Sequence, residues 1–295
     1  QVACKAIEEA KDSDLSALDA ETYVNEVAIE SLAAKPTDSG NEVSVAVPEI
    51  EGDVVSAVDS AELSRRSIIG LCREAISKSE CRSDGTISFI VVNLEACRLS
   101  QSRVLAQGEV RLAFNSPVCS LAHDNDEVER TYNIHFAKLM GAKAELSSER
   151  HGNYLGQYLG GGEILTNTSY GWDLQVLGSH KTVYSRFGRK LADITVSTTG
   201  RISTLFDVAA QARTTHGGSL VIDHNLAKFS ASYSPERLTW DDSCLCPVSG
   251  KLSMSYTGSK RGAGYIEFLS CGQANVKRAN GEVHSVQMPR CIPVE

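Results

Sequence analysis

The sequence is poor in aromatic residues: Phe, Trp and Tyr make up only 6% of its 295 residues. It has no run of about 18 to 20 apolar residues, which excludes a helix that crosses a bilayer. It also has no long run of Lys and Arg, which a nucleic-acid-binding surface needs to replace phosphate counterions, so we expect no nucleic-acid partner. With 42% hydrophobic and 22% charged residues, the chain can still bury one large core or two small ones.

Known catalytic signatures are also missing, among them the nucleophile elbow, the Walker loop, the zinc-protease helix and the dinucleotide-binding loop. Asp223, His224 and Ser219 are residue types that a hydrolase uses. However, neighbours on a strand point to opposite faces, so Asp223 is poorly placed to orient His224. We therefore predict no catalytic residue and no bound cofactor, and we expect that the chain is not an enzyme.

The densest group of oxygen ligands lies between residues 123 and 129. Calcium prefers six to eight oxygen ligands, and a surface loop of this kind can supply several of them. The segment lacks the spacing and the central Gly of an EF-hand loop, so a solvated acidic turn is the favoured interpretation. The candidate ligands of the alternative, a calcium site, are Asp124, Asp126, Glu127 and Glu129.

Acidic charge is concentrated near the N-terminus. Residues 1–60 contain 14 Asp and Glu against three Lys, whereas the rest of the chain carries a small positive balance. We interpret residues 1–58 as an acidic tether or arm. Within it, residues 20–34 are predicted to be helical, with an apolar stripe formed by Val24, Val27, Ala28 and Leu32. Residues 59–81 are predicted to contain a second helix that docks on the body of the protein.

From Thr86 onward the hydrophobic pattern changes to a period of two, which is typical of strands with one apolar and one wet face. The longest alternating run covers residues 164–176, and shorter runs cover 132–136, 202–208 and 220–226. Short Gly-containing turns separate these runs, and such turns leave no room for parallel crossovers. Residues 82–295 are therefore predicted to form a mainly β body, an antiparallel meander or sandwich.

Nine cysteines occur in the chain, eight of them in the body. Local spacing favours disulfides between Cys72 and Cys81 and between Cys97 and Cys119, with the last four cysteines paired among themselves in an order that the sequence leaves open. Disulfides persist in oxidising compartments, so this pattern indicates export. Reduced cytosolic thiols and a zinc site made by the last four are the alternatives, and the Cys-x-Cys spacing of the first two disfavours zinc. The predicted disulfide cysteines are Cys72, Cys81, Cys97, Cys119, Cys244, Cys246, Cys271 and Cys291.

The ninth cysteine, Cys4, follows Val2 and Ala3, which resembles the end of a lipoprotein signal. In that interpretation Cys4 carries the lipid and holds the protein at a membrane, and we expect residues 1–3 to be removed in the cell. The alternative is a free or intermolecular thiol.

Much of the aromatic content falls between residues 154 and 187. Aromatic side chains with polar tips can line a groove for a glycan or a lipid, although packing in a core is their commoner role on alternating strands. The candidate ligand-binding residues are Tyr154, Tyr158, Tyr170, Trp172 and Tyr184.

The last eighty residues carry a set of matching features: Gly217 to Asn225, Trp240 before Cys244-Leu245-Cys246-Pro247, Thr257-Gly258-Ser259, Cys271-Gly272-Gln273-Ala274, Gly281 and Cys291. This segment, about 217–291, resembles a closing β module of uncharacterised secreted or outer-membrane lipoproteins of predatory Gram-negative bacteria. The resemblance implies a location in the cell envelope and implies no activity.

Together these patterns predict a non-catalytic protein of the bacterial envelope, in the periplasm or at the cell surface. It would bind a protein partner, a surface glycan or a hydrophobic ligand. An exported hydrolase and a structural shell protein with a β body remain the alternatives.

Overall fold

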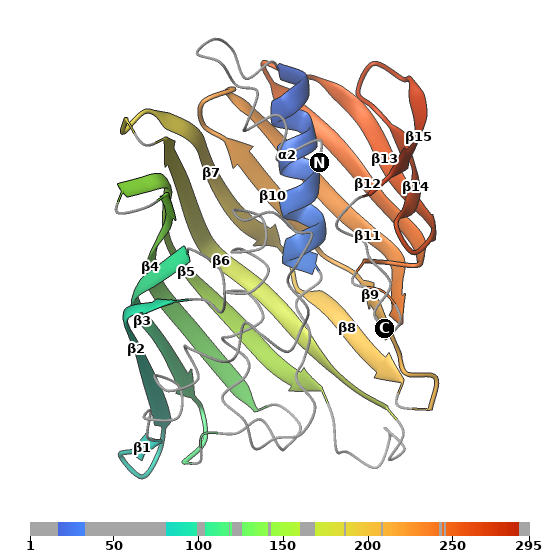
Figure 1. Cartoon of the computed structure of the whole chain (residues 1–295). Helices are drawn as coiled ribbons and strands as arrows, with labels where there is room; N and C mark the ends of the chain where they lie inside the picture. The colour runs from blue at the N-terminus through green and yellow to red at the C-terminus, as the bar shows by residue number, and fades with distance from the viewer. Residues whose placement is uncertain are drawn as a thin grey trace. The chain divides into compact units, whose positions relative to one another are not determined.

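A computed structural model of the chain describes residues 17–32, 81–98, 104–117, 119, 126–140, 143–159, 169–185, 187–207, 209–241, 244 and 246–288. The described residues form a mainly antiparallel β structure with 15 strands, which confirms the predicted fold class. Consecutive strands are neighbours along most of the sheet, so the connectivity is that of a meander (Figure 1). The predicted second helix, within residues 59–81, lies outside the described residues except for Cys81.

The chain divides into two compact units. Unit 1 comprises residues 1–33, 159–175 and 195–295, and unit 2 comprises residues 34–158 and 176–194. Two long strands, β6 (Ser169–Ser185) and β7 (Lys190–Thr199), contribute residues to both units.

Unit 2 contains the first five strands. Strands β2 to β5 pair antiparallel in sequence order, for example Val110 with Tyr132 between β3 and β4. Alternate residues of β2, β3 and β4 are buried and apolar, as the period of two predicts. The strands are β1 (Arg82–Ser83), β2 (Ser88–Arg98), β3 (Val104–Phe114), β4 (Glu127–Met140) and β5 (Lys143–Leu159). The buried apolar residues on them include Ile90, Val110, Leu112, Phe114, Val128 and Ile134.

A close contact between β4 and β5 explains why position 152 is a glycine. Tyr132 on β4 pairs with Gly152 on β5, and a Cβ atom on Gly152 would lie 2.6 Å from the Tyr132 hydroxyl oxygen. The absence of a side chain at Gly152 therefore lets the tyrosine ring cross β5. Its hydroxyl reaches Ser179 on β6, at 2.7 Å between the two oxygens. This hydrogen bond ties β4 to β6.

Unit 1 contains a helix and the last eight strands. The helix predicted over residues 20–34 is found as α2 (Ala17–Leu32). The strands are β8 (Ile202–Asp207), β9 (Ala212–His216), β10 (Ser219–His224), β11 (Phe229–Asp241), β12 (Ser249–Gly258), β13 (Gly262–Ser270), β14 (Gln273–Lys277) and β15 (Val283–Gln287).

Strands β10 to β14 present one continuous buried face. The registers align Leu220 with Tyr233, and Tyr233 with Met254, so that inward residues of successive strands lie side by side. Leu220, Tyr233 and Met254 are each at most 3% exposed. The alternation predicted over 220–226 holds as far as His224. Leu226 was expected to continue the strand, but it lies in the following turn and is half exposed, because the hairpin reverses after residue 224.

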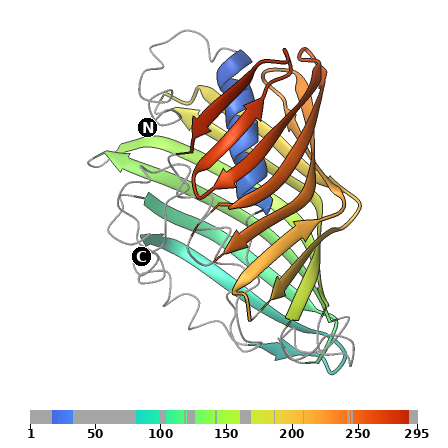
Figure 2. The same cartoon turned by 90° about the vertical axis from the view of Figure 1, so that its right-hand side faces the viewer.

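Helix α2 packs against this part of unit 1, over β10 and its neighbours (Figures 1 and 2). Its predicted apolar stripe is buried: Val24 and Ala28 are fully buried, and Val27 and Leu32 are at most 7% exposed. An isolated helix of 16 residues is marginal in water, so burial of this stripe stabilises α2.

Two disulfides are formed between described cysteines, Cys81 with Cys119 and Cys244 with Cys271. The predicted pairs Cys72–Cys81 and Cys97–Cys119 are therefore wrong. The register gives the reason: Cys119 follows the end of β3 that pairs with Ser88, near Cys81 in the chain, whereas Cys97 lies nine residues further along β2, roughly 30 Å away. Cys72 lies outside the described residues.

The second disulfide joins two of the last four cysteines, Cys244 and Cys271, as the prediction for this group allows. Cys244 and Cys246 are buried and pack with Ile29 of α2, Val248 and Met288. Cys246 is also disulfide-bonded. Because Cys244 and Cys271 are oxidised, they are not available to the zinc site that the sequence left as an alternative. Cys4 and Cys291 lie outside the described residues.

Candidate functional site

A group of ionisable side chains gathers where β5, β6 and β7 adjoin in unit 2. We call it the β5–β7 cluster, and it consists of Glu149, His151, His180, Tyr184, Lys190 and Asp193. Glu149, His151 and Lys190 are exposed, His180 and Tyr184 are partly buried, and Asp193 is buried. The alternation of the strands explains the placement, because Glu149 and His151 are two residues apart and so share a face.

Asp193 lies at the centre of the cluster and holds two neighbours. One carboxylate oxygen, Oδ1, lies 2.8 Å from His180 Nε2, and the other, Oδ2, accepts a hydrogen bond from Lys190 Nζ at 2.8 Å. The Asp193 carboxylate, which raises the pKa of Lys190, keeps that ammonium group charged. The two contacts fix the orientation of the carboxylate, and the carboxylate in turn orients the His180 ring.

The other members of the cluster lie on β5 and β6. The rings of His151 and His180 meet edge to face, with their centres 5.0 Å apart. The Tyr184 hydroxyl donates a long hydrogen bond to Glu149 Oε2 at 3.4 Å. The cluster thus presents three planar side chains beside the exposed Glu149 carboxylate, which can accept hydrogen bonds from a polar ligand while the rings contact its apolar parts.

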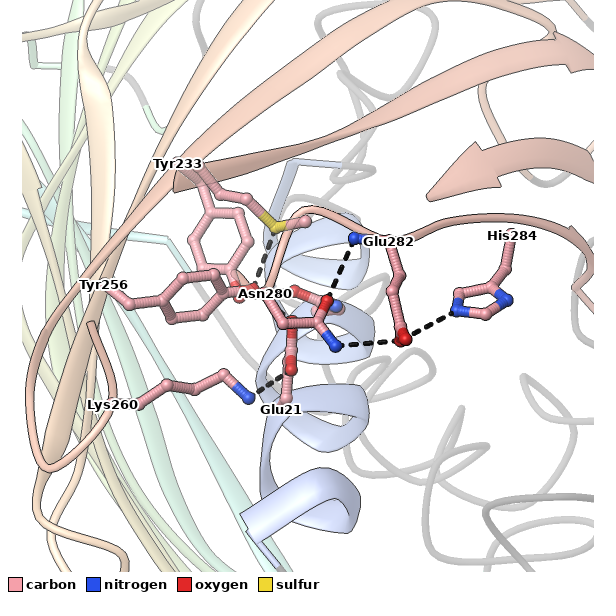
Figure 3. Close-up of polar contacts among 9 residues, drawn as sticks. Glu21, Tyr233, Tyr256, Lys260, Asn280, Glu282 and His284 are labelled. Atoms are coloured by element: carbon pink, nitrogen blue, oxygen red, sulfur yellow. Dashed lines mark hydrogen bonds and ion pairs between the residues drawn. The ribbon is translucent and has the colours of Figure 1, made fainter. Parts of the chain in front are cut away.

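A second polar group, in unit 1, lies between α2 and the sheet (Figure 3). We call it the α2 anchor, and it consists of Glu21, Asn25, Tyr233, Tyr256 and Lys260. The Tyr233 hydroxyl donates to Asn25 Oδ1 at 2.7 Å, and the Tyr256 hydroxyl donates to Glu21 Oε1 at 3.1 Å. Lys260 forms an ion pair with the other carboxylate oxygen of Glu21.

Burial dominates the electrostatics of the α2 anchor. Burial, followed by the negative charge of Glu21, raises the pKa of Tyr256. Burial also raises the pKa of Tyr233, with the neighbouring Tyr256 as the next cause. Both tyrosines therefore stay neutral and donate their hydrogen bonds to the helix. Because Tyr233, Tyr256 and Lys260 all hold polar side chains of the helix, the α2 anchor serves to position α2 on the sheet.

A third group, on the turn between β14 and β15, is exposed (Figure 3). Asn280 Nδ2 donates to Glu282 Oε2 at 2.8 Å, and the same carboxylate oxygen lies 3.5 Å from His284 Nε2. The hydrogen bond from Asn280, followed by that from His284, lowers the pKa of Glu282. These contacts are local to the turn and stabilise its conformation.

The predicted aromatic groove is only partly covered by the described side chains. Tyr184 belongs to the β5–β7 cluster in unit 2, whereas Trp172 lies on the part of β6 that belongs to unit 1. The side chains of Tyr154, Tyr158 and Tyr170 lie outside the described residues. The groove therefore stays a prediction, and Tyr184 is the member for which contacts to other polar groups are known.

The predicted calcium ligands lie before and on the first residues of β4. Asp126 is buried just before β4, and Glu129 accepts a hydrogen bond from Asn153 Nδ2 at 2.8 Å. The backbone N–H of Glu127 donates to Asn115 Oδ1. Asp124 lies outside the described residues. Within the described part of the chain, no group of three or more His, Cys, Asp or Glu side chains is arranged to hold a metal ion.

The residue types of a hydrolase that the sequence offers lie on β10 of unit 1, at Ser219, Asp223 and His224. His224 is buried, stacks on Phe229 and accepts a hydrogen bond through Nδ1 from the backbone N–H of Ala227. The Ser219 hydroxyl is hydrogen-bonded to that of Ser234 at 2.7 Å. These contacts do not link the serine to the histidine.

The sequence did not predict the β5–β7 cluster apart from Tyr184. His151, His180 and Asp193 come from three strands and are separated by up to 42 positions, so no local spacing connects them. The alternation of polar residues on β5 placed Glu149 and His151 on one face, but it carried no sign of which strand would lie beside them.

No protein-family model matches the chain, and no curated protein or solved structure matches it significantly either. Among the described residues, no helix is long and apolar enough to cross a membrane.

Proposed function

We propose that the chain is an extracytoplasmic, disulfide-stabilised binding protein, and that the β5–β7 cluster of unit 2 is its recognition surface for a glycan. The observation that carries this proposal is the composition of the cluster. Tyr184, His151 and His180 offer planar faces with polar edges, Glu149 offers an exposed carboxylate beside them, and the buried Asp193 orients His180.

Sugars fit this chemistry because a pyranose ring has hydroxyl groups at its rim and C–H groups on its faces. Hydrogen bonds from hydroxyl groups to ionised carboxylates are roughly twice as strong as those between neutral groups. Tyrosine contributes apolar area and a polar tip at a small cost in conformational entropy. The contacts of Asp193 with Lys190 and His180 hold the His180 ring in place before a ligand arrives, which lowers the entropic cost of binding.

Oligosaccharides from Gram-negative envelopes, such as lipopolysaccharide cores and peptidoglycan fragments, are the ligands to test first. The protein, purified with its disulfides formed, is titrated with each by calorimetry. We expect Tyr184→Ala and Glu149→Gln each to weaken binding by about tenfold or more, a loss of about 1.4 kcal/mol.

Tyr265→Ala is the matched control. Tyr265 is a partly buried tyrosine of unit 1 that also carries a charged neighbour, because Lys251 Nζ lies 4.8 Å from its ring centre. This variant should bind as the unmodified protein does. Absence of binding to every oligosaccharide, or an equal loss in Tyr265→Ala, would refute the proposal.

The extracytoplasmic location rests on the disulfides together with the resemblance of residues 217–291 to secreted lipoproteins. On a chain-entropy model, closing loops of 38 and 27 residues stabilises the folded state by about 3 to 4 kcal/mol each, which is of use only where thiols stay oxidised. A lipid on Cys4 would add attachment to the outer membrane.

Intact mass with and without reductant tests the location and the anchor together. Protein isolated from its native compartment should gain about two mass units per disulfide on reduction and should carry the added mass of acyl chains on Cys4. Free thiols at Cys81, Cys119, Cys244 and Cys271 would overturn the location. Absence of acyl mass with oxidised cysteines would overturn the anchor alone.

A further inference from the structure

The β5–β7 cluster contains the two elements that a weak transition-metal site requires: a histidine oriented by a carboxylate, and a second histidine beside it. Imidazole nitrogen is a preferred ligand of Zn²⁺, Cu²⁺ and Ni²⁺. Metal-binding histidines commonly donate their other ring N–H to a carboxylate, which fixes the tautomer and makes the free nitrogen more basic.

His180 has this arrangement. Its Nε2 lies 2.8 Å from Asp193 Oδ1, and Lys190 occupies the second oxygen of the same carboxylate at 2.8 Å. Because an ionised carboxylate only accepts, Nε2 carries the proton in this contact. The lone pair of the neutral ring is then on Nδ1, the nitrogen that faces away from Asp193.

His151 supplies the second nitrogen. It lies on β5, the strand next to β6, and its ring centre is 5.0 Å from that of His180. A metal at about 2.0 to 2.1 Å from a nitrogen of each ring is compatible with this separation. His151 is exposed and His180 is partly exposed, so a hydrated metal ion has access from solvent.

We infer that His151 and His180 form a two-histidine site for Zn²⁺, Cu²⁺ or Ni²⁺, with Asp193 as the residue that positions His180. The site offers two protein ligands. The described part of the chain holds no group of three or more potential metal ligands, so no third side chain completes the site. Its affinity is therefore lower than that of closed structural sites, and water or a bound ligand fills the remaining positions. The inference does not rest on the proposed glycan binding.

The test titrates the oxidised protein with ZnCl₂, CuCl₂ and NiCl₂ separately, in the absence of any glycan. We expect His151→Ala and His180→Ala each to lower the affinity by at least tenfold. Asp193→Asn keeps the shape of the side chain but removes its charge, and it should lower the affinity by about 10 to 100-fold.

His284→Ala is the matched control, because His284 is exposed and also lies beside a carboxylate, Glu282 Oε2, at 3.5 Å. It should bind as the unmodified protein does. Circular dichroism of each variant checks that the fold is retained.

A measurement on the unmodified protein keeps the test decisive if a variant fails to fold. In nuclear magnetic resonance, paramagnetic Ni²⁺ should broaden the ring protons of His151 and His180 before those of the other histidines. The inference is overturned if those two signals do not broaden first, or if His284→Ala loses as much affinity as the cluster variants. Glycan titrations repeated in a metal chelator separate failure of this site from failure of the proposed function.

Discussion

The α2 anchor of unit 1 and the β5–β7 cluster of unit 2 use similar groups in different surroundings. In unit 1, Lys260 pairs with Glu21, whose side chain is 3% exposed, and buried tyrosines complete the α2 anchor. In unit 2, Lys190 pairs with Asp193, whose side chain is 11% exposed, and histidines complete the β5–β7 cluster. The clearer difference lies in the lysines, since the side chain of Lys190 is 46% exposed and that of Lys260 is 20% exposed. Each cluster thus combines a lysine, a carboxylate and ring side chains.

Burial decides what such a cluster can do. A buried ion pair has lost its hydration, so each partner depends on the other and on the surrounding hydrogen bonds. An exposed pair contributes little to stability, because water and salt compete with it. The α2 anchor therefore fixes a helix to a sheet, while the β5–β7 cluster leaves Glu149, His151 and Lys190 exposed to a ligand.

Replacing each lysine in turn tests whether the two ion pairs differ in their contribution to stability, and it should give the largest effect. Lys260→Met keeps much of the apolar stem but leaves the Glu21 carboxylate buried without its cation. We expect the free energy of unfolding to fall by about 3 to 5 kcal/mol, as for other broken buried pairs. Lys190→Met should cost clearly less in urea denaturation followed by circular dichroism, because Lys190 is largely exposed and His180 still contacts the Asp193 carboxylate. Equal losses in the two variants would show that the clusters do not differ in this way.

A double variant sharpens the same test. Glu21→Met with Lys260→Met replaces the pair by apolar side chains, so no charge is left buried, and such replacements are often neutral or stabilising. The double variant should therefore be more stable than Lys260→Met alone. A double variant that is less stable would mean that the polar contacts themselves, and not the unpaired carboxylate, determine the loss.

The strands were the part of the fold that the sequence predicted best. Alternation over residues 132–136 and 202–208 marked segments that are strands, with Ile134 and Ile202 buried as expected. A period of two is a local property, because successive side chains of any strand point to opposite faces. The residue at which a strand ends depends on contacts outside the strand. The alternating spacing continued to Leu226 and predicted a strand there, although this residue lies in the hairpin turn.

Disulfide pairing could not be predicted, because it depends on register. Cys97 and Cys119 flank a hairpin, which made them an attractive pair. In the register of β2 and β3, however, Cys97 pairs with Ala106 and not with the end of the hairpin near Cys119. Register follows from contacts along the whole strand pair, and spacing between cysteines does not report it.

The helix was predicted from its apolar stripe, but its anchor was not. Glu21 and Asn25 lie one turn apart on α2, and the sequence alone marks them as solvent-facing polar residues. Their partners, Tyr233 and Tyr256, are more than 200 positions away in the chain. The β5–β7 cluster was hidden for a similar reason, because its residues come from three separate strands, so both the α2 anchor and the β5–β7 cluster are products of tertiary structure.

The buried tyrosines of the α2 anchor make the stability of the folded protein depend on pH. An unfolded tyrosine ionises near pH 10, whereas in the folded protein Tyr233 and Tyr256 have raised pKa values and keep their protons. Above pH 10 the unfolded chain therefore binds fewer protons than the folded one, so stability is complete below pH 10 and falls as the pH rises further.

A series of urea denaturation curves between pH 8 and pH 11, with the disulfides intact, measures this loss, and tyrosinate absorbance at 295 nm follows the ionisation. Each buried tyrosine contributes a slope that approaches about 1.4 kcal/mol per pH unit. Tyr256→Phe removes one of the two groups, so the fall in stability above pH 10 should be clearly shallower than in the unmodified protein, whatever the variant costs at pH 8. An unchanged slope would mean that Tyr256 ionises in the folded state, and that α2 does not keep the tyrosine away from solvent.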